Sequence, residues 1–355
     1  MKILYCPIIH DHSIFTTDIG DYQADTLFHG LRSLFGEDVV DCFKMWHLYD
    51  DAKKDDLATL WGKGFTTYGL LPDIKIDRDD IKSKVDSQYY DLIVCPIHHT
   101  EVNNKPAVFN TIASLLKSYP KNKIAIIDGW DRQPLEIRIA SQAPYFKREL
   151  SQSYRSVAKP ISFSLPKEKI QNPLTEKRQF DFAPLIPAYM HFDDPHQKTY
   201  IYGTEEEYYE MYKNSYFAYT CKKAREDDMA AGWDCMRHYE ILACGSIPFF
   251  TDIEKCPSLT LTKFPKDLCV RAKQMKGVHP GVKEPPKDSH GFYINSGFIG
   301  TSKQIKPGDE RGHIDVDTFD KHEYEDLQIK FMEHTRKHLT TEAMAKYFIE
   351  EMKKC

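Results

Sequence analysis

The most informative part of this sequence is Gly232-Trp-Asp-Cys-Met-Arg-His-Tyr-Glu-Ile-Leu-Ala-Cys-Gly-Ser-Ile-Pro-Phe-Phe-Thr-Asp252. Its residues 235–244 have helical spacing, with Asp234 at the position of an N-cap and Gly245 at the position that ends a helix. Residues 247–250 then form a short apolar run, which is typical of a buried strand. The stretch therefore predicts a helix that leads directly into a strand.

Three charged side chains share the polar face of this predicted helix. Asp234, Arg237 and Glu240 follow one another at intervals of three residues, while residues 241–243 turn toward a core. A cation beside a carboxylate near the start of a helix can hold a nucleoside diphosphate and its ribose. The same charges also fit an amphipathic helix with an intrahelical ion pair of about 0.2–0.5 kcal/mol, which needs no ligand.

The run from Arg237 to Pro248 resembles the donor-binding helix of GT-B glycosyltransferases, in particular exostosin-like and related enzymes. Their motif is approximately Arg, two residues, Glu, two residues, Ala, one residue, Gly, one residue, Ile-Pro, and this chain places Arg237, Glu240, Ala243 and Gly245 at the matching positions. The resemblance implies a nucleotide-sugar donor, with Glu240 accepting hydrogen bonds from the ribose hydroxyls and Arg237 facing the diphosphate.

The resemblance is close only over residues 232–252, and the chain departs from the family in two respects. No glycine-rich donor loop follows the first predicted strand. Exostosin-like enzymes also usually carry membrane anchors and disulfides, whereas this chain looks more like a soluble bacterial or viral enzyme.

Length and composition indicate an ordinary soluble globular protein of about two domains. The chain has 355 residues, of which 41% are hydrophobic and 28% charged. Its formal net charge of −5 argues against a general nucleic-acid binder, because phosphate contacts require a basic surface. We therefore expect no nucleic acid among its partners.

Cysteines and hydropathy indicate a cytoplasmic protein. The nine cysteines are an odd number without a paired metal spacing, which favours reduced thiols. No apolar run approaches the roughly 18 residues of a membrane span. We expect no integral membrane segment, and peripheral association stays open.

Alternating strands and helices predict an α/β protein. The first half has apolar strand runs and helical patterns in turn, and such βαβ order predicts a parallel sheet covered on both faces. The expected strands are residues 3–6, 39–43, 92–97 and 124–127, and the expected helices are 22–35 and 108–116. Residues 53–89, rich in Asp and Lys, predict an irregular insertion.

The second half repeats this alternation. Expected extended segments are 180–185, 198–202 and 216–221, expected helices are 205–213, 321–338 and 341–354, and residues 276–312 read as a long loop. We predict two Rossmann-like domains that face a cleft, which is the GT-B plan. Residues 1–155 would form the acceptor domain, 156–338 the nucleotide-sugar donor domain, and 339–355 a helix that packs back toward the first domain.

Basic residues at two places are candidates for binding the donor phosphates. Lys222 and Lys223, with Arg225, stand at the end of the predicted strand 216–221, just before the motif helix. Lys147 and Arg148 lie near the predicted crossing between domains. A solvated basic turn and an exposed helix end, respectively, are the alternatives that need no ligand.

We expect the general base at the ends of strands in the first half, because open α/β sheets bind ligands beyond the carboxyl ends of their strands. A base must take the proton of the acceptor hydroxyl, and His or an oriented Asp suits this role. The candidates, which the sequence does not separate, are His10, Asp11, His12, Asp18 and Asp128, with the cluster His98, His99 and Glu101 at a further strand end.

We expect no metal and no tightly bound cofactor. The histidine pairs lack the three or four ligands at recognisable spacing that a zinc site needs. Asp315-Val-Asp317 matches the metal-binding signature of the other major glycosyltransferase fold, but it lies outside an evident strand end and is interpreted as chance. A UDP- or GDP-sugar would be the donor substrate.

The predicted function is transfer of a sugar from a nucleoside diphosphate sugar to a hydroxyl of a glycan or other acceptor, in glycan or glycoconjugate synthesis. Two alternatives stay open. The first is a sugar-nucleotide epimerase of the same two-domain plan, and the second is a non-catalytic GT-B-like binding or scaffold protein.

Overall fold

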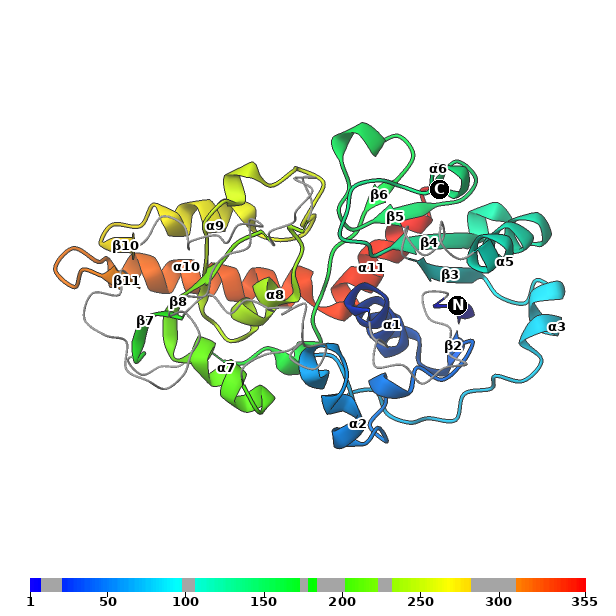
Figure 1. The fold of residues 1–355 in the computed structure, drawn as a ribbon, viewed down its shortest axis with the longest axis horizontal. Coiled ribbons are helices and arrows are strands. Elements are labelled where there is room, and N and C mark those ends of the chain that lie inside the picture. Colours follow the sequence, from blue (N-terminus) through cyan, green and yellow to red (C-terminus); the bar gives the residue numbers. More distant parts are fainter. Residues whose placement is uncertain (8–20, 98–105, 173–177, 184–201, 223–231, 282–310) are drawn as a thin grey trace. The chain divides into compact units, whose positions relative to one another are not determined.

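The computed structural model has an α/β fold and describes residues 1–7, 21–97, 106–172, 178–183, 202–222, 232–281 and 311–355 (Figure 1). The chain forms two compact units. The first contains Met1–Pro166, Pro257–Lys263 and Thr340–Cys355, and the second contains Lys167–Cys256 and Phe264–Leu339. The predicted cleft between two Rossmann-like domains stays a prediction.

A parallel six-stranded sheet forms the centre of the first unit, in the order β2-β1-β3-β4-β5-β6. The strands are β1 (Ile3–Tyr5), β2 (Val39–Asp41), β3 (Leu92–Ile97), β4 (Ile124–Asp128), β5 (Tyr145–Lys147) and β6 (Lys159–Pro160). The first four confirm the strands expected from the sequence. β5 was not expected, and the interpretation of residues 147–148 as an exposed helix end is wrong because Lys147 and Arg148 are both buried.

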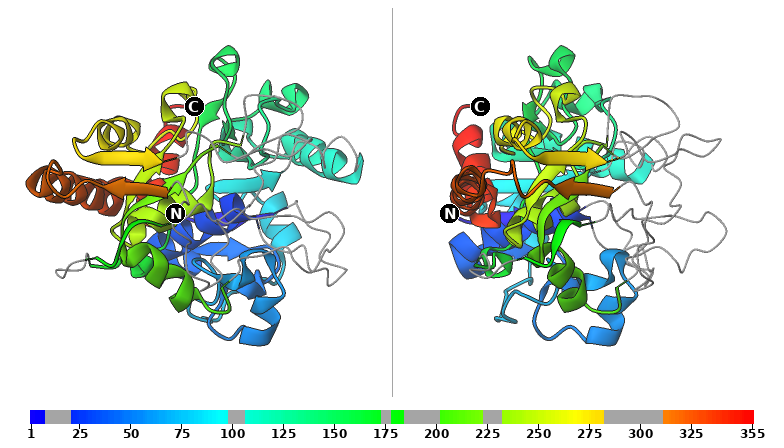
Figure 2. Two further views of the ribbon diagram at one scale, coloured as in Figure 1. Left: turned by 60° about the vertical axis from the view of Figure 1, so that its left-hand side comes forward. Right: turned by 90° about the vertical axis from the view of Figure 1, so that its left-hand side faces the viewer.

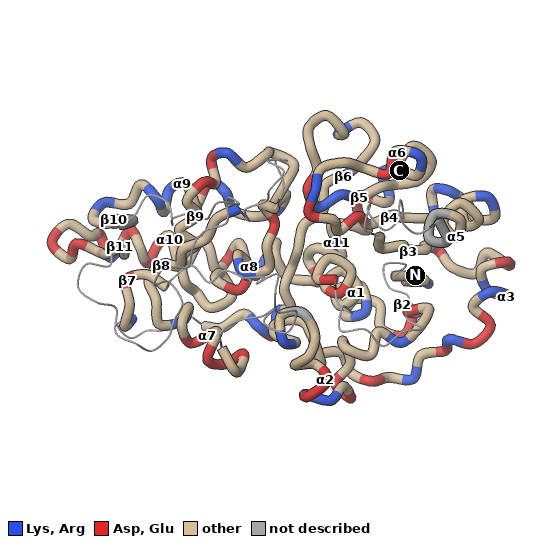
Figure 3. Tube along the Cα trace, viewed as in Figure 1, with Lys and Arg blue, Asp and Glu red and all other residues tan. Residues whose placement is uncertain are grey.

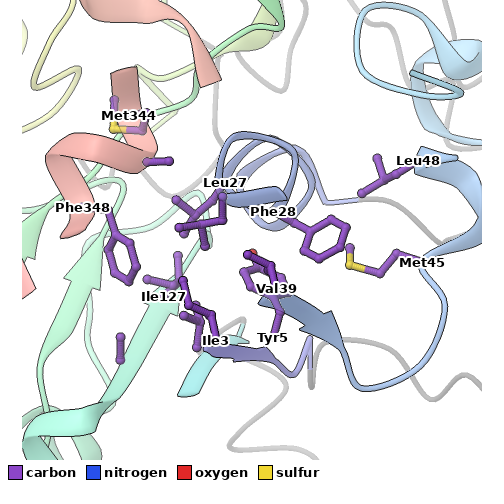
Figure 4. Packing of buried hydrophobic residues seen from close by; sticks show 14 of the residues in the cluster. Ile3, Tyr5, Leu27, Phe28, Val39, Met45, Leu48, Ile127, Met344 and Phe348 are labelled. Atoms are coloured by element: carbon purple, nitrogen blue, oxygen red, sulfur yellow. The ribbon is translucent and has the colours of Figure 1, made fainter. Parts of the chain in front are cut away.

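Helices cover both faces of this sheet. On one face α1 (Tyr22–Phe35) and α11 (Thr341–Met352) lie side by side (Figure 2). Figure 4 shows Leu27 and Phe28 of α1 and Phe348 of α11 pointing into one apolar cluster with Ile3 and Ile127 of the sheet. On the other face α5 (Pro106–Ser118) and α6 (Ile137–Ala140) pack over a second cluster. Both faces are thus buried, as a parallel sheet requires.

The close approach of α1 to α11 depends on Gly30. A Cβ atom at this position would overlap the carbonyl oxygen of Thr341 and lie 3.1 Å from the Cβ atom of Ala345. We expect Gly30→Ala to destabilise the protein by about 1–3 kcal/mol or more, since the backbone of α11 must move. Denaturant unfolding of this variant beside Gly203→Ala, where the nearest atom would be 3.5 Å away, checks it. Equal midpoints for both variants would contradict this packing.

The stretch between β2 and β3 is less irregular than expected. It contains α2 (Lys54–Ala58) and α3 (Ile81–Asp86), and Leu60, Tyr68 and Leu71 are buried in the first core cluster. Charged residues of both signs follow one another along its outer part (Figure 3). This contribution to the core was not predicted, because the apolar residues of the stretch follow neither the helical nor the strand period.

The second unit has a parallel sheet of β7 (Phe180–Ala183), β8 (Ser215–Thr220) and β9 (Ile247–Phe250). Its helices are α7 (Glu205–Lys213), α8 (Met236–Ala243), α9 (Lys266–Lys273) and α10 (Lys321–His334), the last followed by a π-helical turn at Thr335–Leu339. β10 (Val278–Gly281) pairs antiparallel with β11 (Arg311–Ile314). The expectation of one loop over 276–312 is therefore wrong at both of its ends, while residues 198–201 lie outside the described residues.

Buried tyrosines are a shared feature of both units. Burial raises the pKa of Tyr90, Tyr202 and Tyr219 to about 12 and holds that of other buried tyrosines well above the usual value. These others include Tyr5, Tyr145 and Tyr212.

The raised tyrosine pKa values predict a loss of stability at alkaline pH. Their contribution is complete below about pH 10, where unfolded tyrosine stays protonated, and it falls at higher pH, because there the unfolded state releases protons that the folded state keeps. The free energy of unfolding should therefore drop steeply above about pH 10. Titration of phenolate absorbance should show delayed ionisation that coincides with loss of circular dichroism, whereas free ionisation at the ordinary pKa in a folded protein would contradict it.

Candidate functional site

The motif helix α8 starts one residue later than the capping pattern predicts. Cys235 is its N-cap residue and makes no side-chain capping bond, whereas Asp234 is fully buried and accepts a hydrogen bond of 2.9 Å from the hydroxyl of Tyr239. The prediction of Asp234 as N-cap is therefore wrong, because a phenol of the same helix takes its carboxylate. Gly245 has φ of 71°, which confirms the predicted end of the helix.

The start of α8 is tied to the carboxyl ends of the strands beside it. β8, α8 and β9 form a parallel crossover, so α8 begins on the side where β8 ends. His238 of α8 lies 2.7 Å from the hydroxyl of Thr220 at the end of β8 and 2.8 Å from the carbonyl oxygen of Trp233. This imidazole therefore links the strand end to the residues that lead into the helix.

Arg237 and Glu240 are buried polar groups on α8. Arg237 is 7% exposed, and its Nε donates to the Thr220 hydroxyl at 3.4 Å. Glu240 is fully buried, and its Oε2 accepts a hydrogen bond of 2.6 Å from Tyr208 of α7. The Tyr208 hydroxyl in turn lies 3.3 Å from that of Tyr212. The cation and the carboxylate thus lie within a cluster of tyrosines. Because both side chains are buried, they do not belong to the solvated polar face of an amphipathic helix.

The guanidinium of Arg237 stays charged in this environment. Burial works to lower its pKa, but Cys235, Tyr212 and Cys221 outweigh burial and hold the pKa above its usual value. A permanent positive charge with little exposure suits the binding of an anionic group that enters the same environment.

Lys222 lies at the end of β8, as expected. Its backbone N–H donates to Oδ1 of Asp252 at 3.3 Å, which joins the ends of β8 and β9, and its Nζ lies 5.7 Å from the centre of the Trp233 ring. Burial raises the pKa of Asp252. Lys223 and Arg225 lie outside the described residues.

In the first unit, Asp128 ends β4 and is held by three donors. Its Oδ1 lies 3.1 Å from Nζ of Lys147 and 3.0 Å from the backbone nitrogen of Trp130, and its Oδ2 accepts from Tyr145 at 2.8 Å. Asp128 and Lys147 are both fully buried. A carboxylate that accepts three hydrogen bonds from buried donors is a poor general base, because most of its roughly four acceptor sites are already engaged.

The side chains of Lys147 and Arg148 also form their hydrogen bonds and ion pairs within the first unit. Lys147 donates to the carbonyl oxygen of Trp130 at 2.9 Å, and burial lowers its pKa. Arg148 donates to the carbonyl oxygen of Gly129 at 2.9 Å, forms an ion pair with Asp131, and lies over the ring of Phe163. These contacts make both cations parts of a buried network at the ends of β4 and β5.

Several predicted residues fall outside the described part of the chain. They are His10, Asp11, His12 and Asp18 among the candidate bases, and His98, His99 and Glu101. Asp315, of the sequence match to a metal signature, accepts from the hydroxyl of Thr318 at 2.8 Å and from the backbone of Asp317 at 3.1 Å, which is a local turn. Among the described residues, no group of three or more His, Cys, Asp or Glu is placed to hold a metal ion.

Three residues that contact the motif were not predicted as part of the site: Tyr208, Tyr212 and His238. Tyr208 and Tyr212 are four residues apart in the predicted helix 205–213, so they share one face, and His238 lies inside the quoted motif. The spacing of the two tyrosines predicts that they lie on the same face of α7. The sequence does not predict that this face packs against α8.

Comparison with known proteins gives one weak structural similarity. No family model and no curated protein matches the chain. A solved structure of an alpha-glucosyltransferase in complex with UDP and a 13-mer DNA containing a HMU base is similar with a TM-score of 0.42 and 12% identity, over 99% of both chains. Similarity at this level carries no argument about activity, and the resemblance to exostosin-like enzymes stays a prediction.

One expectation about partners is corrected. Nucleic acid was excluded on the net charge of −5, but the similar glucosyltransferase is seen with DNA. A formal net charge averages over the whole surface and says nothing about a local basic region, so the exclusion does not stand. Among the described residues, no helix is long and apolar enough to cross a membrane.

Proposed function

We propose that this chain is a glycosyltransferase that moves a sugar from a UDP- or GDP-sugar to an acceptor hydroxyl. The observation that supports the proposal is the burial of Arg237 and Glu240 together on α8, on the side of the second sheet where β8 ends. Ligands of open α/β sheets bind beyond the carboxyl ends of the strands. We assign the donor role to the second unit, Lys167–Cys256 and Phe264–Leu339, and the acceptor role to the first unit, which includes α11.

In this proposal each polar group on α8 has a separate role. Arg237 neutralises the diphosphate, which is the leaving group, and Lys222 and Lys223 add positive charge beside it. Glu240 accepts hydrogen bonds from the ribose hydroxyls, and the 2.6 Å hydrogen bond from Tyr208 keeps its carboxylate in one orientation. Since side chains supply the positive charge, the transfer requires no metal.

The acceptor side of the proposal rests on the first unit. The base that takes the proton of the acceptor hydroxyl is drawn from His10, Asp11, His12 and Asp18, because the carboxylate of Asp128 is occupied by three donors. Lys147 and Arg148 support that edge of the first sheet through their contacts with Asp128 and Asp131.

The test is incubation of the full chain with a panel of UDP- and GDP-sugars, with and without acceptors, in the presence of a chelator. The acceptors are oligosaccharides and DNA that contains HMU. Release of UDP or GDP together with a glycosylated acceptor supports the proposal. A changed sugar that stays on its nucleotide would instead indicate an epimerase, and absence of binding to every donor would indicate a scaffold protein.

A further inference from the structure

Three cysteines stand side by side across the first sheet. β1 pairs in register with β2 on one side and with β3 on the other, and this register places Cys6 between Cys42 and Cys95. The backbone confirms the alignment, because the N–H of Cys42 donates to the carbonyl oxygen of Tyr5 at 2.9 Å and that of Cys6 to Val94 at 2.8 Å. Cys6 therefore has one thiol neighbour on each side.

All three thiols lie on the same face of the sheet. Cys95 belongs to the second core cluster, and Cys6 and Cys42 are half-buried residues that pack against it. Neighbouring strands lie about 4.8 Å apart, within the Cα separation of about 4.4–6.8 Å that a disulfide spans. The neighbouring Cys42 thiol, together with burial, raises the pKa of the Cys6 thiol.

The ends of the strands make Cys42 the better partner. β1 ends at Tyr5 and β2 at Asp41, so Cys6 and Cys42 both lie one residue beyond their strands, where the backbone can adjust to bring two Cβ atoms together. Cys95 lies inside β3 and is held in register with Ile126 of β4 on its other side. A bond from Cys6 to Cys95 would therefore have to distort two strand pairs.

We propose that Cys6 and Cys42 form an oxidative modification site, at which a small disulfide such as oxidised glutathione converts the two thiols into a bond between the ends of β1 and β2. One cysteine thiolate attacks the small disulfide and releases one small thiol, leaving a mixed disulfide. The second cysteine then attacks the protein sulfur of that mixed disulfide and releases the second small thiol. Two protein thiols become one disulfide, and one small disulfide becomes two thiols. The inference does not depend on the proposed function.

The test is oxidation of the full chain with oxidised glutathione at mildly alkaline pH, followed by alkylation, tryptic digestion and mass spectrometry. The alkaline pH is needed because the thiolate is the nucleophile and the Cys6 thiol, which faces Cys42, Cys95 and Tyr90, has a raised pKa. Trypsin should release residues 3–32 and 33–44 as separate peptides that contain one cysteine each. The expected result is a peptide pair linked through Cys6 and Cys42, which a reductant separates.

Variants decide between the two possible partners of Cys6. Cys42→Ser should abolish the linked pair, while the matched variant Cys95→Ser should keep it at the level of the native chain. Linkage of residues 3–32 to the peptide that contains Cys95 would overturn the proposal. Separate glutathione adducts on Cys6 and Cys42, without a linked pair in the folded native chain, would overturn it as well.

Discussion

Arg237→Ala is expected to weaken the binding of UDP or GDP to this chain by about ten- to a hundredfold. Hydrogen bonds to charged groups contribute about 1.5–3 kcal/mol, and each 1.4 kcal/mol is a factor of ten in affinity. The buried position of Arg237, 7% exposed, places the effect at the upper end, because less water screens a diphosphate there. Calorimetric titration of the folded variant with each nucleotide measures it.

The control for this prediction is another arginine of the second unit. Arg271 forms ion pairs of 3.3 Å with Glu323 and Asp326 on the surface, and its side chain is 38% exposed. Arg271→Ala should leave nucleotide affinity unchanged. Equal affinities for the native chain, Arg237→Ala and Arg271→Ala would show that the nucleotide does not contact α8.

Glu240 extends the same prediction to the ribose. Glu240→Gln keeps the size of the side chain and an acceptor for Tyr208 but removes the charge that strengthens hydrogen bonds from ribose hydroxyls. Affinity for UDP should fall several-fold, and affinity for a dideoxy analogue that lacks both hydroxyls should change little. A similar loss for both ligands would mean that the substitution acts through the fold around Tyr208 rather than on the ribose.

Periodicity in the sequence was sufficient where an element depends on its own residues. The helix at 22–35 and the strands at 92–97 and 247–250 have the predicted bounds, since an unbroken apolar pattern and flanking glycine or capping residues determine them locally. The donor helix was also expected, although Asp234 was placed wrongly as its cap. The hydroxyl of Tyr239, five residues further along the chain, donates a hydrogen bond to the Asp234 carboxylate, which the capping pattern had assigned to a backbone N–H.

Elements that depend on distant partners were missed. β5 has only three residues and contains Lys147, a residue type that is rarely buried, and it becomes a core strand because Asp128 of β4 supplies the opposite charge. β10 and β11 are separated by 29 residues that lie outside the described part, so neither has a partner nearby in the sequence. The tyrosines around Glu240 depend in the same way on the packing of α7 against α8.

The ion pair between Asp128 and Lys147 should be among the most sensitive points of the first unit. Lys147→Ala is expected to lower the free energy of unfolding by about 3–5 kcal/mol, because it leaves a carboxylate buried without its cation. Asp128→Asn should cost less than Asp128→Ala, since the amide oxygen can still accept from the backbone of Trp130 and the amide N–H can donate to the hydroxyl of Tyr145. Denaturant unfolding of these variants measures the differences.

The exposed pair of Lys82 and Asp86 is the matched control for this buried pair. Its atoms are 2.6 Å apart, but both side chains are largely exposed, and such pairs contribute about 0–1 kcal/mol. Lys82→Ala should therefore leave the unfolding midpoint almost unchanged. Lys147→Met combined with Asp128→Leu removes both charges and should recover much of the stability lost in Lys147→Ala, because the cost comes from the unpaired charge rather than from the loss of the pair itself. A double variant as unstable as Lys147→Ala would instead assign the cost to the hydrogen bonds that Asp128 accepts.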